Sequence, residues 1–200
     1  MVEAVTPTLH RLAVLLALLA FPCAVFAHRL DEYLQATLVA IEPSGVRLQI
    51  HLTPGVAVAE QVLALIDRNR DGTISPSEAA TYAEVLKRDL TLRLDRRKLA
   101  LKITAAEFSS PAALRTGWGI IQVEFSATPE PLASGAHRLA LENRHLTTMS
   151  VYLLNAAQPR SGTVRITRQK RNNTQSAGEI AFTVHPAACH YPASSQRETL

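Results

Sequence analysis

Hydrophobic and polar residues alternate with a period of two along much of the chain. The clearest case is VRLQIHL, residues 46–52, in which every second residue is hydrophobic. Such alternation is typical of a β-strand with one face on a core and the other in water. Residues 32–41 alternate less strictly, and the turn residues EPSG at 42–45 follow them. The two segments are therefore predicted to form an antiparallel hairpin.

The same alternation recurs later in the chain. A second hairpin is predicted from alternating leucine and isoleucine residues on both sides of the turn DRR, residues 95–97. Further strands are predicted around residues 121–125, 139–141, 151–153, 164–166 and 180–184. Roughly nine short strands with Pro, Gly, Ser or Asn between them are typical of two packed sheets. The predicted fold class is mainly β, an antiparallel β-sandwich of the immunoglobulin-like kind.

Residues 56–89 depart from this pattern. Thr53, Pro54 and Gly55 are expected to end a strand and redirect the chain. Hydrophobic residues then recur at helical spacing, at Val58, Val62, Leu65 and Ile66 and again at Tyr82, Val85, Leu86 and Leu90. This spacing predicts two helices. The sandwich is thus expected to carry a helix-loop-helix insert at residues 56–90.

The stretch between these helices is DRNRDGTISPSE, residues 67–78. A hard divalent cation such as calcium takes about six to eight oxygen ligands, which a short loop supplies from alternate positions. Suitable residues occupy the first, third, fifth, seventh, ninth and twelfth positions, namely Asp67, Asn69, Asp71, Thr73, Ser75 and Glu78. Thr73 would offer its backbone carbonyl, and Glu78 would bind through both carboxylate oxygens. Gly72 at the sixth position permits the positive φ of a sharp turn.

With these residues in place, the segment 58–90 resembles an EF-hand of the calmodulin type. The resemblance implies one bound Ca²⁺. Three anionic ligands and the neighbouring Arg68 and Arg70 predict a modest affinity, and Mg²⁺ is a possible alternative occupant. EF-hands usually pair through the eighth residue, here Ile74, but the chain has no second loop of this kind. Ile74 is therefore expected to contact another part of the chain or a second copy of it.

A capped turn without an ion is the alternative interpretation of this loop. NRDG is a good turn sequence, and SPSE is a capping box with Ser75 as N-cap, Pro76 at the first helical position and Glu78 at the third. This alternative leaves Asp67 at the carboxyl end of a helix, where the helix dipole disfavours a negative charge. Calcium would explain that position, so the ion-binding interpretation is preferred.

The amino-terminal residues indicate export. An unbroken hydrophobic run at residues 12–27 follows Arg11 and ends in small-residue positions that suit cleavage before His28. A retained membrane anchor is the less favoured alternative, because the run is shorter than the roughly 20 residues of a spanning helix. Cleavage removes Cys23 and leaves Cys189 without a partner for a disulfide. The predicted organisation is a signal peptide at 1–27, one domain at 28–185 and a disordered tail at 186–200, in the periplasm or secreted.

Composition and the remaining motifs argue against two classes of function, nucleic-acid binding and catalysis. The chain is 47% hydrophobic with a net charge of +4, and its basic segment RITRQKR, residues 165–171, is interpreted as a solvated hairpin end rather than a nucleic-acid site. His51, His137, His145, His185 and His190 show no short ligand spacing and are interpreted as surface residues. Trp118 is expected to pack at the sandwich edge. No pairing of nucleophile and base indicates an enzyme.

Residues 28–67 and 142–169 resemble the exported N-terminal domain of bacterial membrane proteins that are similar to nickel-uptake accessory permeases. This chain departs from that pattern because it has no membrane part. The likeness implies a bacterial, exported origin. The predicted function is an exported calcium-binding module. The alternative is an accessory or interaction domain of a membrane metal-transport system, in which the loop is structural and the partner is a membrane protein or a second copy.

Overall fold

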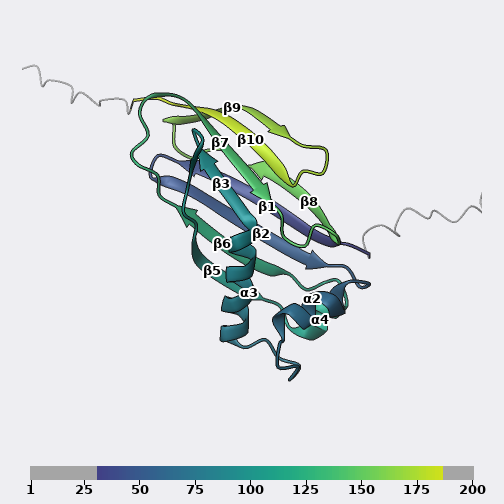
Figure 1. The fold of residues 1–200 in the computed structure, drawn as a ribbon. Coiled ribbons are helices and arrows are strands. Elements are labelled where there is room, and N and C mark those ends of the chain that lie inside the picture. Colours follow the sequence, from purple (N-terminus) through teal and green to yellow (C-terminus); the bar gives the residue numbers. More distant parts are fainter. Residues whose placement is uncertain (1–30, 187–200) are drawn as a thin grey trace, which may run out of the picture.

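The structure, a computed structural model, describes residues 31–186 and consists mainly of two facing β-sheets (Figure 1). Sheet A has the strand order β5-β6-β2-β1-β8, with β1 (Tyr33–Glu42), β2 (Gly45–Pro54), β5 (Lys102–Phe108), β6 (Ile121–Ala127) and β8 (Ser150–Ala156). Sheet B has the order β4-β3-β7-β10-β9, with β3 (Leu90–Leu94), β4 (Arg97–Lys98), β7 (Gly135–Asn143), β9 (Val164–Arg171) and β10 (Ala177–Val184). The predicted mainly β, sandwich-like architecture is confirmed.

The first predicted hairpin is confirmed. β1 and β2 are antiparallel neighbours, with Tyr33 opposite Pro54 and Glu42 opposite Gly45. Val46, Leu48, Ile50 and Leu52 are all buried, as their alternation predicts. The inward face of β2 therefore forms the centre of sheet A's contribution to the core.

One strand pair is parallel, although the sandwich was predicted to be antiparallel. β1 and β8 are parallel neighbours, with Tyr33 opposite Ser150 and Val39 opposite Ala156. Period-two alternation shows which face of a strand is buried but carries no information on strand direction. The two strands are distant in sequence, so no turn between them could reveal their relative orientation.

The second predicted hairpin is only partly correct. β3 pairs with the two-residue strand β4, with Arg93 opposite Lys98. The chain then leaves sheet B, and the next residues with hydrophobic alternation form β5 in sheet A. Leu99, Leu101 and Ile103 pack against the core without being fully buried. The second arm of the expected hairpin is thus divided between the two sheets.

β8 also differs from its prediction, in which Val151 and Leu153 were the alternating hydrophobic residues of the strand. Tyr152 and Leu154 are buried, whereas Leu153 is exposed and Val151 is half-buried. The segment VYLLNA has hydrophobic residues in both phases, so the alternation did not distinguish its two faces.

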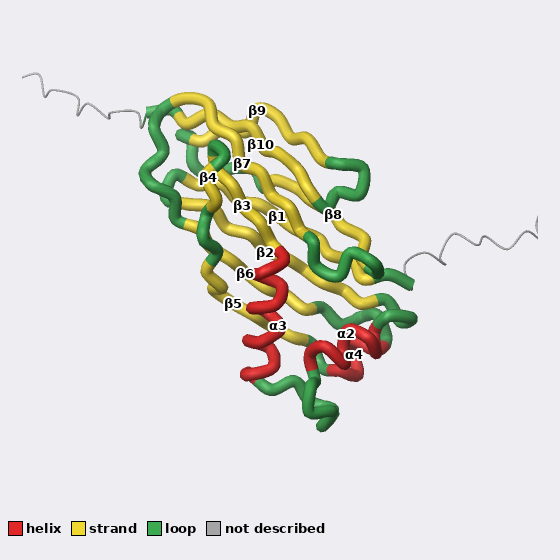
Figure 2. The backbone as a smooth tube through the Cα atoms, in the orientation of Figure 1, coloured by secondary structure: helices red, strands yellow, loops and turns green. Residues whose placement is uncertain are grey.

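Three helices cover one end of the sandwich (Figure 2), namely α2 (Ala59–Ile66), α3 (Pro76–Asp89) and α4 (Pro111–Arg115). The first two lie on either side of residues 67–75, where the helical spacing predicts them. α2 buries Val62 and Ile66 in the same hydrophobic core as both sheets, but Leu65 is exposed rather than on the buried face. α4 was not predicted; the Ser110 hydroxyl caps it by accepting a hydrogen bond from the Ala113 N–H.

None of the helices within residues 31–186 is long and apolar enough to cross a bilayer. The predicted signal peptide at 1–27 and, apart from Pro186, the predicted disordered tail at 186–200 lie outside the described residues. The same holds for Cys23, His28, Cys189 and His190.

Candidate metal-binding loop

The polar stretch 67–78 comprises the loop between α2 and α3 and the first turn of α3. It lies at the end of the molecule opposite β9 and β10 (Figure 1). Both flanking helices are fixed to the core, α2 through Ile66 and α3 through Leu86. Ile74, in the middle of the loop, is partly buried and packs against the same core. Of the two contacts expected for Ile74, the structure therefore shows the one within its own chain.

Oxygen atoms of the first and third loop residues converge on one backbone group. The Asp71 N–H donates to Asp67 Oδ1 and to Asn69 Oδ1, each at 3.1 Å. Asp67 Oδ2 accepts a further hydrogen bond from the Gly72 N–H at 3.0 Å. Gly72 has a φ of +82°, as expected for the sharp turn. The loop thus directs the side chains of Asp67 and Asn69 to the same side of the backbone.

Glu78, the twelfth residue, connects the two ends of the loop. Its Oε1 accepts a hydrogen bond from the Arg68 N–H at 3.0 Å. Its Oε2 accepts from the Ser75 N–H at 3.0 Å and from the Ser75 hydroxyl at 2.7 Å. The Ser75 hydroxyl also accepts from the Glu78 N–H, so the predicted capping box is present. The carboxylate at the end of the loop is thereby held beside its beginning.

The remaining carboxylate, Asp71, is oriented by its neighbours. Its Oδ1 accepts from the Thr73 N–H at 2.8 Å and the Thr73 hydroxyl at 2.7 Å, and its Oδ2 accepts from the Asn69 amide at 2.8 Å. The hydrogen bonds from Thr73 lower the pKa of Asp71, and those from Ser75 lower the pKa of Glu78. Both groups are therefore ionised at neutral pH, which is the form a metal ion requires.

The three carboxylates do not form a compact cluster. Within residues 31–186, no three His, Cys, Asp or Glu side chains are grouped closely enough to hold a metal ion together. Asp67 is buried at the end of α2, and the backbone donors of Asp71 and Gly72 compensate its charge. Calcium is thus not needed to explain the position of Asp67, which removes one reason for preferring it over a capped turn.

The chemistry of the donor atoms nevertheless fits a hard cation. Carboxylate, amide, hydroxyl and backbone carbonyl oxygens are the ligands that calcium takes, and His and Cys are absent from residues 67–78. Arg68 and Arg70 are exposed. The loop can therefore hold a divalent cation if its carboxylates exchange some backbone hydrogen bonds for the ion.

Comparison with known proteins adds no assignment. No protein-family model matches the chain, and no curated protein matches it either. The resemblances to an EF-hand and to an exported bacterial domain therefore stay predictions from the residues.

A buried polar network that the sequence analysis missed fixes α3 to the sandwich. The Tyr82 hydroxyl is hydrogen-bonded to the Tyr33 hydroxyl at 2.7 Å and to His145 Nε2 at 2.9 Å. His145 Nδ1 lies 2.7 Å from Asp89 Oδ2 at the end of α3. A neutral imidazole that donates from Nδ1 to Asp89 can accept from Tyr82 at Nε2. His145 is buried, so its interpretation as a surface residue was wrong.

The network continues into both sheets. The Gln35 amide donates to the His145 backbone carbonyl at 2.8 Å, and the Asn143 amide donates to Gln35 Oε1 at 2.9 Å. The Tyr152 hydroxyl donates to the same His145 carbonyl at 2.8 Å. Gln35 lies at an inward position of β1, between Tyr33 and Thr37. A polar residue in the buried phase of a strand was the signal in the sequence that could have indicated this network.

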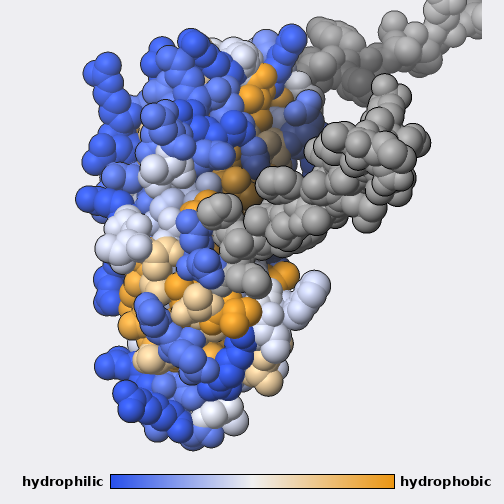
Figure 3. Space-filling model, turned by 90° about the vertical axis from the view of Figure 1, so that its right-hand side faces the viewer, coloured by the Kyte–Doolittle hydropathy of each residue, from blue (hydrophilic) through white to orange (hydrophobic). Residues whose placement is uncertain are grey.

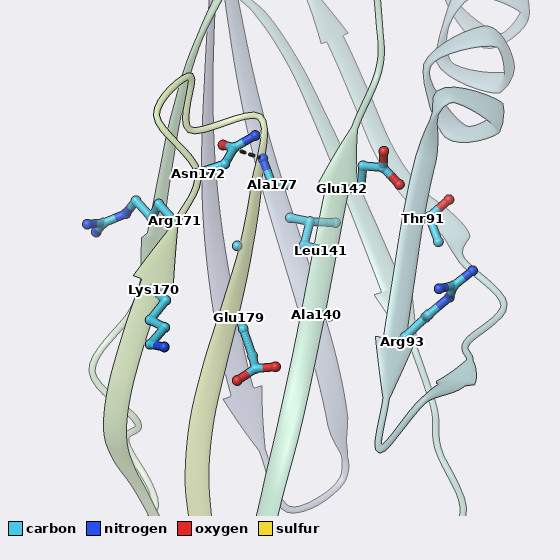
Figure 4. A pocket seen from close by; sticks show the side chains of 11 residues that line it. Thr91, Arg93, Ala140, Leu141, Glu142, Lys170, Arg171, Asn172, Ala177 and Glu179 are labelled. Carbon is cyan, nitrogen blue, oxygen red and sulfur yellow. Dashed lines mark hydrogen bonds between the residues drawn. The ribbon is translucent and has the colours of Figure 1, made fainter.

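A hollow of about 350 Å³ lies on the outer face of sheet B (Figure 4). Its lining includes Arg93 from β3, Glu142 from β7, Lys170 from β9 and Glu179 from β10. Charges of both signs on neighbouring strands are typical of a solvated sheet face. The basic segment 165–171 lies in β9, in a hairpin with β10, and contributes Lys170 and Arg171 to this lining.

Proposed function

We propose that this protein is an exported calcium-binding module in which the loop 67–78 holds one Ca²⁺. The observation that carries the proposal is the position of Glu78, whose carboxylate crosses the loop to the Arg68 N–H while Asp67 and Asn69 converge on the Asp71 N–H. Oxygens from both ends of the loop are thereby brought near one another. The hydrophobic run at residues 12–27 supports export.

The proposed ligands are Asp67, Asn69, Asp71, Thr73, Ser75 and Glu78. Calcium would compete with backbone N–H groups for the carboxylate oxygens, which lowers its net affinity. A solvated arginine charge about 7 Å from the ion costs a further ~0.6 kcal/mol. We therefore expect a dissociation constant near 0.1 mM, on the order of that of extracellular calcium modules.

Such an affinity is sufficient outside a cell. With about 1 mM calcium and a dissociation constant of about 0.1 mM, binding stabilises the folded state by roughly 1.4 kcal/mol. For a domain of this size, that corresponds to a rise in melting temperature of about 3–6 °C.

The proposed role of the ion is to brace the fold rather than to open it. α3 continues directly into β3, since Asp89 ends the helix and Leu90 begins the strand. Tyr82 on α3 is hydrogen-bonded to Tyr33 on β1. Because α3 is attached to both sheets, it has little freedom to swing when the loop binds an ion.

Calorimetric titration of calcium tests the proposal. The wild-type protein should bind one ion per chain and melt at a higher temperature with calcium than with chelator. Glu78→Gln should lose both effects, because it removes the ligand charge that connects the two loop ends. Glu84→Gln is the matched control, since Glu84 is exposed on the same helix and pairs with Lys87. This control should bind calcium like the wild type.

Melting temperatures in chelator show whether each variant is folded. If the wild-type protein gives no heat of binding and no thermal shift, residues 67–78 are a capped turn and the calcium proposal is wrong. If Glu78→Gln binds as tightly as Glu84→Gln, the ion is held elsewhere in the chain.

A further inference from the structure

Trp118 lies almost entirely in solvent, with 87% of its surface exposed. The expectation that it packs at the sandwich edge was therefore wrong. It is the only tryptophan in the chain, and it lies between α4 and β6 in the sequence GWGI, residues 117–120. A single exposed hydrophobic residue is ordinary, whereas a contiguous group of them marks an interaction surface.

The backbone around Trp118 is fixed rather than loose. Gly117 has a φ of +73°, and its N–H donates to the Leu114 carbonyl at 3.2 Å. The Gly119 N–H donates to the Ala113 carbonyl at 2.8 Å. A Cβ at Gly119 would lie 2.6 Å from the Leu114 nitrogen, so only glycine fits this close approach to α4. The two glycines thus hold Trp118 in its exposed position.

Two more exposed hydrophobic residues accompany Trp118, with Val56 49% and Ile120 45% exposed. Val56 is adjacent to the turn, since its Cγ2 lies 3.6 Å from the position that a Cβ on Gly117 would take. We name Val56, Trp118 and Ile120 the Trp118 tip. Hydrophobic side chains gather in this half of the molecule, above the polar loop at its end (Figure 3). Close by, Arg115 pairs with Glu60 at 2.6 Å, so these two charges compensate each other.

The described part of the chain begins at this end, shortly after the hydrophobic run in the sequence. The Gly55 N–H donates to the Glu32 carbonyl at 2.9 Å, and Val56 is the next residue. The run at 12–27 ends only a few residues before Glu32, a stretch that spans at most about 17 Å when fully extended. Whenever residues 12–27 lie in a bilayer, the Trp118 tip is therefore within reach of its surface.

We infer that the Trp118 tip is a membrane-contacting surface of the chain before its cleavage at His28, which lies at the lipid–water interface while residues 12–27 occupy the bilayer. Tryptophan is enriched at that interface because its ring is apolar and its indole N–H is polar. Val56 and Ile120 add apolar area beside it. This contact is separate from the proposed calcium site and does not require calcium.

Fluorescence tests the inference, because all tryptophan emission of the chain comes from Trp118. The full chain, with residues 1–27 intact, is incorporated into vesicles of phosphatidylcholine and phosphatidylglycerol. The emission should shift to shorter wavelength and should be quenched when the lipids carry bromine near the headgroup end of their acyl chains. Glu78→Gln should show the same shift, with or without calcium.

Two variants with Trp118 unchanged localise the contact. Val56→Ser combined with Ile120→Ser should lose most of the shift and the quenching. Leu38→Ser is the matched control, because Leu38 is 41% exposed but lies midway along β1, six residues after Glu32. It should keep both effects.

Three results would overturn the inference. Emission that stays unshifted and unquenched in vesicles would place Trp118 in water. A shift that appears without lipid and grows with protein concentration would assign the tip to contact with a second copy. Equal loss of the shift in the Leu38 control and in the double variant would mean that the contact is not specific to the tip.

Discussion

Two histidines of this protein occupy environments that shift their pKa values in opposite directions. Burial lowers the pKa of His145, against the smaller opposing effect of Asp89. His137 has a raised pKa because its Nδ1 is hydrogen-bonded to Asp95 at 2.7 Å. The ordinary pKa of histidine is about 6.5. The two residues therefore give the folding free energy opposite dependences on pH.

The contribution of His145 to stability is complete above about pH 6.5 and declines as the pH falls toward its lowered pKa, because the unfolded chain binds the proton more tightly. The contribution of His137 is complete below about pH 6.5 and is lost as the pH rises through its raised pKa. Urea unfolding across this range should show a smaller acid loss of stability in His145→Gln and a smaller loss on raising the pH in His137→Gln. The exposed His185 provides the control variant His185→Gln. An unchanged acid profile in His145→Gln would contradict the assignment.

The structure leaves no space for a methyl group at Gly119. Gly119→Ala should lower the unfolding free energy by about 1–3 kcal/mol, because the new Cβ would collide with the backbone of Ala113 and Leu114. Gly162→Ala is the control, since no atom lies within 4 Å of the added Cβ. It should be neutral or should stabilise by up to about 1 kcal/mol. Chemical denaturation of both variants measures the difference.

At the residue scale, the types and spacing of the loop side chains were readable from the sequence, but their hydrogen bonds were not. The capping box of Ser75 and Glu78 was predicted because it depends on positions only three apart. The hydrogen bonds to the Asp67 carboxylate come from the Asp71 and Gly72 N–H groups. They depend on the backbone conformation, which residue types alone do not specify.

At the element scale, α3 depends on its first turn. Ser75→Ala removes the N-cap hydroxyl and its hydrogen bond to Glu78. It should lower the unfolding free energy in chelator by about 1 kcal/mol. Under the calcium proposal, it should also weaken the ion's affinity. Ser77→Ala, a change at an exposed position of the same turn, should have a smaller effect on both the unfolding free energy and the calcium affinity. Urea unfolding measures the first quantity and calorimetry the second. Equal losses in the two variants would contradict the role of the Ser75 hydroxyl.

Elements with a clear period were predicted, and those without one were missed. β2 has hydrophobic residues in a single phase, so both the strand and its buried face were predictable. β8 has them in both phases, and α4 is too short for helical periodicity to be recognised. The buried faces of such elements are decided by neighbours that lie far away in sequence.

At the scale of the whole molecule, side-chain hydrogen bonds join β9, the edge strand of sheet B, to β8, the edge strand of sheet A. The Gln169 amide donates to the Leu154 carbonyl at 3.1 Å, and Gln169 Oε1 accepts from the Ala156 N–H at 3.3 Å. Arg171 donates to the same Leu154 carbonyl. Side chains of sheet B thus satisfy backbone groups on the edge strand of sheet A, which an edge strand otherwise exposes to pairing with other chains.

Gln169→Ala should open this edge. The amide of Ala156 should then exchange its hydrogen with solvent faster, because it loses the acceptor that protects it. Gln158→Ala, at an exposed position after β8, should leave the exchange unchanged. Hydrogen exchange followed by mass spectrometry or NMR makes the comparison, and equal protection of β8 in both variants would contradict the role of Gln169.

The fold class was predictable because many short alternating segments require two packed sheets. The order of strands, the parallel pairing of β1 and β8, and the passage of the chain from β4 to β5 were not. Each of these depends on contacts between residues that are distant in sequence, where local patterns carry no information.

The direct passage of α3 into β3 also has a consequence for how the chain folds. The insert at residues 55–89 is the first connection from sheet A to sheet B, and in a flexible form it would be a long loop whose ends must meet by diffusion. Loop closure costs entropy that increases with the logarithm of loop length. Once α2 and α3 have formed, the flexible part of this connection is little more than residues 67–75. Formation of the two helices would thus lower the entropic cost of bringing the two halves of the sandwich together.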